Sequence, residues 1–108
     1  MIKIPFSDWR KELLKNSKLV QDDDDTTSTE EAERRFNRYV QLVDMVNGKE
    51  AQEVFQALVD SIRVPEDYGA YEAVHRALWK FSPDDFADYF VAALPKLIRR
   101  MAKHDQVV

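Results

Sequence analysis

Two short patterns in the sequence carry residue types that could bind a metal ion, and the first contains a histidine. Glu72 and His75 form a Glu-x-x-His pair, the spacing used in carboxylate-bridged di-iron bundles. Such a centre needs this pair twice, together with further glutamates, and the sequence has one copy. We therefore interpret His75 as a partly exposed histidine on a helix and predict no metal centre here.

The second pattern is the acidic run "DDDDTTSTEEAE", which begins at Asp22. It has acids at positions 1, 3 and 12, as calcium-binding loops do, but Thr27 stands at position 6, where such a loop needs glycine. A helix start is also expected inside this window. We therefore predict an exposed acidic loop over about residues 21–28, without a metal ion or any other cofactor.

Catalytic motifs are the next question, and the composition argues against them. The chain has no cysteine and only two glycines, so thiolate chemistry and glycine-rich phosphate loops find no support. Neither His75 nor His104 has an evident serine partner that it could activate as a general base. We predict that the protein is not an enzyme. An enzyme or metalloprotein of the helical-bundle type is the competing interpretation.

Residues 67–90, "DYGAYEAVHRALWKFSPDDFADYF", combine aromatic and acidic side chains. Helical spacing assigns two apolar stripes of this stretch to the core, and we place Trp79 and Phe81 with it. Tyrosines flanked by carboxylates are typical of surfaces that bind a basic protein, although helix capping also explains Asp84 and Asp85. The predicted partner-binding residues, with those of the acidic loop, are Asp22, Asp23, Asp24, Asp25, Glu66, Asp67, Tyr68, Tyr71, Asp84, Asp85, Asp88 and Tyr89. The two predicted core stripes are Val74, Leu78 and Phe81, and Phe86, Phe90 and Leu94.

Five helices account for the apolar spacing of the whole chain. We expect the first to begin after Ser7 as N-cap and the second near residues 27–29. A capping box there would pair Thr27 with Glu30 or Ser28 with Glu31. The third is expected over about 49–63 and the fourth over about 70–80. The last should begin at "SPDD", with Ser82 as N-cap, and be kinked or split at Pro95.

These elements predict an all-α fold, a compact bundle of about five helices arranged as antiparallel hairpins. Residues 1–108 are expected to form a single helical domain. No clear internal repeat is present, so we expect a bundle rather than a true solenoid.

Charge and hydropathy set limits on partners and location. The net charge is -4, and residues 22–31 carry acids but no cation. An acidic chain is poorly suited to nucleic acid and well suited to a basic protein. We expect no membrane binding, because no apolar run approaches the roughly 18 residues of a membrane span and the acidic loop would oppose anionic lipids. Without cysteines or an apolar leader, the chain is expected to be cytoplasmic.

The C-terminal half resembles a known group of proteins. Tyr68–Glu72, Leu78–Phe81, Pro83 and Ala93–Leu97 form a pattern that resembles small bacterial immunity proteins. These are the antidotes encoded beside polymorphic toxins and contact-dependent growth inhibition systems. The resemblance covers about a third of the chain, involves structural residues, and carries no catalytic signature.

The resemblance implies a protein that binds one cognate toxin domain and neutralises it by protein–protein interaction. The toxin would be a basic protein and could be a nuclease. The acidic loop could then imitate a phosphate backbone. We expect a monomer rather than a homodimer. The alternatives are a helical adaptor or regulatory subunit, which could be homodimeric, and a nucleic-acid binder that uses the basic segments at the two ends.

Overall fold

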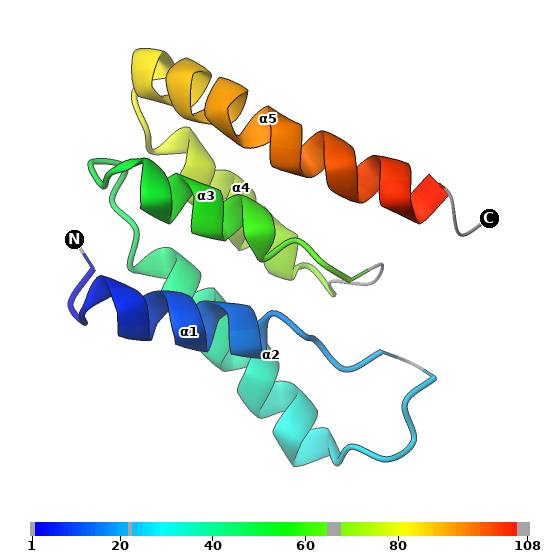
Figure 1. Cartoon of the computed structure of the whole chain (residues 1–108). Helices are drawn as coiled ribbons and strands as arrows, with labels where there is room; N and C mark the ends of the chain where they lie inside the picture. The colour runs from blue at the N-terminus through cyan, green and yellow to red at the C-terminus, as the bar shows by residue number, and fades with distance from the viewer. Residues whose placement is uncertain (1, 22, 65–67, 106–108) are drawn as a thin grey trace.

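Five helices follow one another along the chain, joined by short turns and one longer loop. The computed structural model describes residues 2–21, 23–64 and 68–105, with side chains described as far as Arg99. The helices are α1 (Phe6–Asn16), α2 (Thr29–Asp44), α3 (Gln52–Asp60), α4 (Ala70–Trp79) and α5 (Pro83–Asp105). Figure 1 shows α1, α3 and α5 running one way and α2 and α4 the other.

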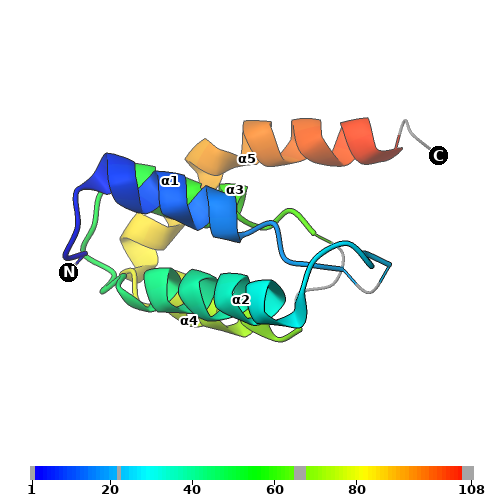
Figure 2. The ribbon, with the colours of Figure 1, turned by 90° about the horizontal axis from the view of Figure 1, so that it is seen from below.

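The helices form two layers of stacked hairpins. α1 packs on α2 and α3, α4 packs on α2, and α5 packs on α3. In Figure 2, α2 and α4 lie together on one side, with α1 and α3 on the other. The thinnest extent of the molecule is 22 Å, which matches two helices packed about 10 Å apart plus their outer side chains. The all-α fold of five antiparallel helices is thereby confirmed.

The core lies between the two layers and is tied together by a few polar contacts. Buried Trp9 donates its indole N–H to the carbonyl of Leu42 at 2.9 Å, which joins α1 to α2. The hydroxyl of buried Tyr39 lies 2.7 Å from Ser61 Oγ, which joins α2 to the end of α3. Because each buried polar group finds a partner, these aromatic residues can fill the core without a desolvation penalty.

Helix starts follow the capping signals in two cases and not in a third. Ser28 caps α2 by accepting the N–H of Glu31 at 3.2 Å, and Ser82 Oγ accepts the N–H of Asp85 at 3.1 Å. The predicted cap at Ser7 is wrong, because α1 begins at Phe6 and Pro5 is its N-cap. The carbonyl of Pro5 accepts the N–H of Trp9 at 2.9 Å, and the fixed φ of proline suits this position.

Helix ends differ more from the expected ranges. α2 ends at Asp44, and in the connection that follows, the carboxylate of Glu50 accepts the N–H groups of Asn47 and Gly48 at 2.9 Å each. α3 is correspondingly shorter than the expected 49–63. α5 is not split at Pro95 and runs through it as one helix. Proline removes the N–H that would reach the carbonyl of Val91, and Val91 lies on an exposed side where water can replace it.

Two aromatic residues predicted for the core lie at its edge instead. Phe81 is buried as expected, but the side chain of Trp79 is 69% exposed and that of Phe90 is 41% exposed. The prediction for Trp79 is wrong because Trp79 lies at the end of α4, at the edge of the stack. Among the described residues, no further helix covers this side.

Candidate partner-binding surfaces

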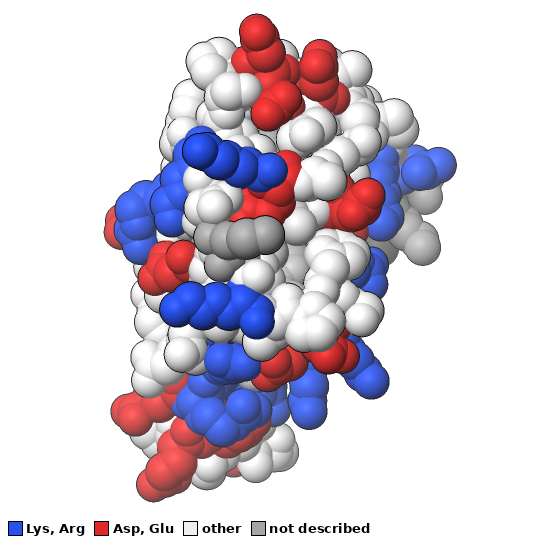
Figure 3. All heavy atoms as spheres, turned by 90° about the vertical axis from the view of Figure 1, so that its left-hand side faces the viewer, with Lys and Arg blue, Asp and Glu red and all other residues white. Residues whose placement is uncertain are grey.

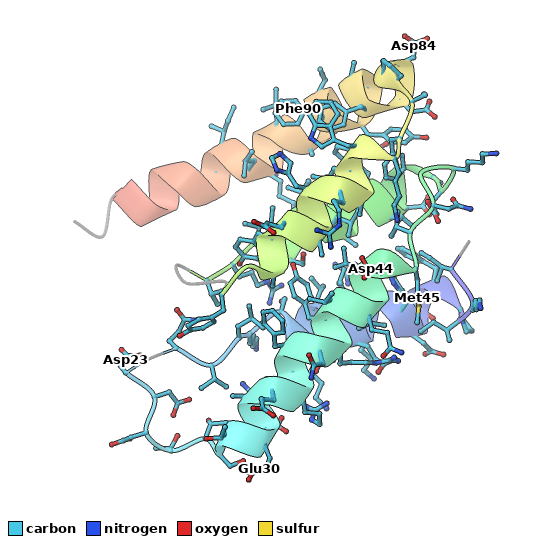
Figure 4. All side chains as sticks on the ribbon, turned by 180° about the vertical axis from the view of Figure 1, so that it is seen from behind. Asp23, Glu30, Asp44, Met45, Asp84 and Phe90 are labelled. Carbon is cyan, nitrogen blue, oxygen red and sulfur yellow. The ribbon has the colours of Figure 1, made fainter. Side chains whose placement is uncertain are left out.

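The predicted partner-binding residues divide between opposite ends of the molecule. Asp22, Glu66 and Asp67 lie outside the described residues. Of the others, Asp23–Asp25 lie in the loop before α2, and Asp84, Asp85 and Asp88 lie at the start of α5. Figure 4 shows Asp23 and Asp84 at opposite ends. A partner surface of ordinary size would therefore cover only one of these two acidic groups.

The acidic loop has a defined shape, which Asp24 imposes. Its Oδ1 accepts the N–H of Thr26 at 2.8 Å and the Thr26 hydroxyl at 2.7 Å. Its Oδ2 accepts the hydroxyl of Thr27 at 2.8 Å. These hydrogen bonds, chiefly those from Thr26, lower the pKa of Asp24 to about 2. Asp24 therefore stays ionised at neutral pH and holds the neighbouring Asp23 and Asp25 toward solvent.

The loop borders a shallow hollow of about 430 Å³ whose wall includes Tyr68, from the turn before α4. Apolar groups line it from Leu19, Val20 and Phe36, while Asp24 and Glu33 supply carboxylates. We call this end of the molecule the acidic pole, formed by Asp23, Asp24, Asp25, Glu33 and Tyr68. An apolar hollow with an acidic rim suits the aliphatic stem and cationic head of a lysine or arginine.

Tyr68, which belongs to the acidic pole, has an unusual backbone conformation. Its φ is 53°, and Gly69, which follows, has φ 91°. Left-handed backbone costs a residue with a side chain about 1 kcal/mol or more. The tyrosine ring is 44% exposed beside the hollow.

Tyr71 and Tyr89, by contrast, have structural contacts. The hydroxyl of Tyr71 accepts the N–H groups of Arg63 and Val64 at 3.0 and 3.1 Å, and its ring packs edge-on against Tyr39. Tyr89 packs edge-on against Phe55 and is partly buried. Both residues therefore support the packing of helices rather than presenting open rings to a partner.

The second acidic group, at the start of α5, is consistent with helix capping. Asp84 and Asp85 lie in the first turn, where carboxylates interact favourably with the positive end of the helix dipole. Figure 3 shows acidic side chains gathered at the top, over the start of α5, with mixed charges below.

Ion pairs elsewhere leave both acidic groups available. The salt bridges among the described residues join Glu31 to Arg34 and Arg35, Glu12 to Arg38, and Asp60 to Lys96. None of them uses the carboxylates of the acidic pole or of the first turns of α5. These charges can therefore interact with a partner without first breaking an internal pair.

The described residues hold no group of three or more side chains suited to a metal ion. Glu72 and His75 lie on the exposed side of α4, and the His75 ring lies 6.3 Å from the Trp79 ring. Their surroundings therefore give no specific support to a metal centre.

A second surface, which the sequence analysis missed, lies between α3, α4 and α5. It is a groove of about 880 Å³ whose lining includes Ile62, Trp79, Phe86, Phe90 and Leu97. Trp79 stacks on Phe86 with ring centroids 5.3 Å apart, and Phe86 stacks on Phe90 at 5.9 Å. The signal was present in the sequence, because the apolar residues of α5 cover more of its circumference than one packed neighbour needs.

Comparison with protein-family models, with curated proteins and with solved structures finds no match for this chain. Within the described part of the chain, every helix is too short or too polar to cross a membrane.

Proposed function

We propose that this protein is an immunity protein, which binds a cognate toxin domain and neutralises it without catalysis of its own. The observation that supports this most is the acidic pole. There, Tyr68 and the shaped acidic loop, which are far apart in the sequence, border one apolar hollow. An exposed tyrosine beside ionised carboxylates favours a basic protein partner.

Binding would begin with long-range attraction between the acidic pole and a basic surface of the toxin. A lysine or arginine of the toxin would then enter the hollow, with its stem against Phe36 and Tyr68 and its head near Asp24. If that basic surface is the toxin's substrate cleft, occupation by the inhibitor blocks the substrate directly.

The first experiment is co-expression of this protein with the C-terminal domain of whichever large open reading frame lies next to its gene. Rescue of growth together with co-purification as a stable complex supports the proposal. Toxicity without rescue, or rescue without a complex, would contradict it.

Binding kinetics then test the role of the acidic pole. Asp23→Asn with Asp25→Asn should slow association about tenfold at low salt and flatten its salt dependence. Tyr68→Ala should mainly speed dissociation. The matched control is Asp84→Asn with Asp88→Asn at the opposite end, which should leave the kinetics unchanged. If the control variant loses binding and the pole variants do not, the toxin binds at the start of α5.

A second candidate function, a helical adaptor or regulatory subunit, is favoured by a different observation. The apolar side of α5 and Trp79 remain uncovered in the described chain, as expected of a subunit that packs against another chain.

A further inference from the structure

The groove between α4 and α5 has α3 as its floor. Phe55 of α3 is buried at its base. Its walls carry Trp79 of α4 and, on α5, Phe86, Phe90 and Leu97. At about 100° and 1.5 Å per residue, these three residues of α5 lie within about 40° of one another along about 16 Å of the helix. The groove is therefore about three helical turns long.

The apolar walls of the groove are fixed in place and remain largely open to solvent. The ring of Phe86 stacks on those of both Trp79 and Phe90, with interplanar angles of 9° and 8°. Trp79, Phe90 and Ile62 are nevertheless 69%, 41% and 40% exposed. Contiguous exposed apolar side chains whose positions are already set by mutual packing mark a binding site.

Cations outnumber carboxylates along the described lining of the groove. The cations are Arg10, Arg63 and Lys96. The one carboxylate in that lining belongs to Asp60, whose Oδ2 lies 3.1 Å from Lys96 Nζ, so these two charges neutralise each other. Arg63 Nε donates to the main-chain carbonyl of Asp60 at 3.1 Å. Within the described residues, Arg10 and Arg63 make no salt bridge, and their charges remain uncompensated in a protein whose net charge is -4.

The same excess of cations continues along α4. A smaller hollow beside the groove is lined by Arg76 and Lys80, against the carboxylate of Glu72. His75 lines both the hollow and the groove, which shows that the two adjoin. Cations therefore border the apolar groove both on the side of α4 and at the end of α3.

The acidic turns at the start of α5 do not offset this charge inside the groove. Counted at about 100° per residue, Asp84, Asp85 and Asp88 lie about 120–180° round the helix from the centre of its groove-lining stripe. None of the three belongs to the described lining. The groove can therefore attract negative charge although acids begin the same helix.

We infer that this groove binds an acidic amphipathic helix of a partner protein. Such a helix would place apolar residues at i, i+4 and i+7 against Trp79, Phe90 and Leu97. Its carboxylates would lie beside Arg63 and the cations of α4, which favour an acidic helix over a neutral or basic one. A small molecule fits less well, because ligand pockets enclose most of the surface of their ligand, whereas this groove is open along its length.

This surface differs from the acidic pole in both charge and place. Figure 4 shows Phe90 of the groove and Asp23 of the acidic pole in separate parts of the molecule. The acidic pole attracts cations and the groove attracts anions. The inference therefore does not rest on the proposed function.

Phage display of a helical peptide library tests the inference, with the full chain as the target. Each peptide has about four helical turns, with leucine at the apolar positions and an equal chance of glutamate or lysine at all others. Peptides are counted when Trp79→Ala abolishes their binding, which leaves out those that bind the acidic pole. We expect the counted peptides to carry at least about twice as many glutamates as lysines. A balanced or lysine-rich composition overturns the inference, as does the absence of any peptide that depends on Trp79.

Charge variants then test which side chains select the acidic peptide. Arg10→Gln with Arg63→Gln should weaken binding of the best acidic peptide about tenfold and flatten its salt dependence. The matched control is Lys3→Gln with Lys49→Gln, which removes the same charge from exposed positions outside the groove. The control should change the affinity by less than about twofold. Equal losses in the two double variants would show that overall charge selects the peptide, and the inference would fail.

The fluorescence of Trp79 locates the bound peptide and detects other occupants. Trp9 is fully buried, so a tryptophan-free peptide in the groove should shift the emission of Trp79 to shorter wavelength, and Trp79→Phe should lose this shift. Oleate is the probe for a small anion, and sedimentation equilibrium detects a second copy of the chain. A shift with oleate but with no peptide contradicts the inference, as does self-association that Trp79→Ala abolishes. None of these measurements uses the toxin, so their outcome is separate from that of the proposed function.

Discussion

At the residue scale, the two glycines lack a side chain for different reasons. Gly48 and Gly69 both have φ 91°. A Cβ on Gly48 would meet the backbone of Lys80, with the carbonyl oxygen 2.1 Å away, whereas a Cβ on Gly69 would meet nothing within 4 Å. Gly48 therefore lets the turn after α2 approach the end of α4, where Lys80 Nζ also donates to the carbonyl of Val46 at 2.9 Å.

Replacement of each glycine by alanine measures these two effects. Gly69→Ala should lower the free energy of unfolding by about 1–2 kcal/mol, the cost of left-handed backbone alone. Gly48→Ala carries that cost plus a clash with the backbone, and we expect about 3–4 kcal/mol in total. Chemical denaturation of both variants gives the difference. Equal losses would show that the turn can move away from Lys80 without cost.

The ion pairs of Glu31 predict how stability depends on pH. Hydrogen bonds from Arg34 and then Arg35 lower the pKa of Glu31 to about 2, from an ordinary value of 4.5. A lowered folded-state pKa stabilises the protein above pH 4.5, and this contribution disappears as the pH falls toward 2.

Thermal unfolding between pH 7 and pH 2 checks this. Glu31→Gln should be less stable than the wild type at pH 7, and the two curves should converge toward pH 2. Glu30→Gln, whose parent residue makes no salt bridge within the described chain, should follow the wild-type curve. A gap between Glu31→Gln and wild type that stays constant down to pH 2 would contradict the ionic origin of the effect.

At the element scale, Pro95 interrupts the hydrogen bonds of α5 without interrupting the helix. Proline inside a helix costs about 3 kcal/mol relative to alanine, and Pro95 lies on an exposed side where alanine meets no obstruction. Pro95→Ala should therefore raise the free energy of unfolding by about 1–3 kcal/mol.

The matched control is Pro83→Ala at the first position of the same helix, where no intrahelical hydrogen bond is lost to proline. Its effect should stay within about 0.5 kcal/mol. Denaturation midpoints of the two variants measure these changes in stability. A neutral Pro95→Ala would mean that residues beyond the proline add little to the stability of the fold.

The same elements show what sequence could and could not predict. Short-range signals worked where a side chain acts on its own helix, as Ser28 and Ser82 do. They failed at the start of α1, where Pro5 and not Ser7 is the N-cap. Trp79 was misplaced because helical spacing identifies an apolar face but not whether another helix covers it.

At the scale of the whole molecule, local sequence patterns also could not predict which residues of the candidate site lie together. Composition indicated an acidic surface, and the capping pattern placed the loop before α2. Only the fold shows that Tyr68 meets the acidic loop while Asp84 lies at the other end (Figure 4). That residues distant in sequence, such as Tyr68 and Phe36, line one hollow follows from the stacking of hairpins and not from local patterns.

The stack of hairpins also predicts where the molecule opens first. α5 packs chiefly on α3, whereas α3 also contacts α1 and α4, and an end unit held by one neighbour opens more easily than an inner one. In hydrogen exchange at about 1 µM, amides of α5 beyond Pro95 should exchange at least a hundredfold faster than those of α3. Equal protection of α3 and α5 would show that the five helices open as one cooperative unit.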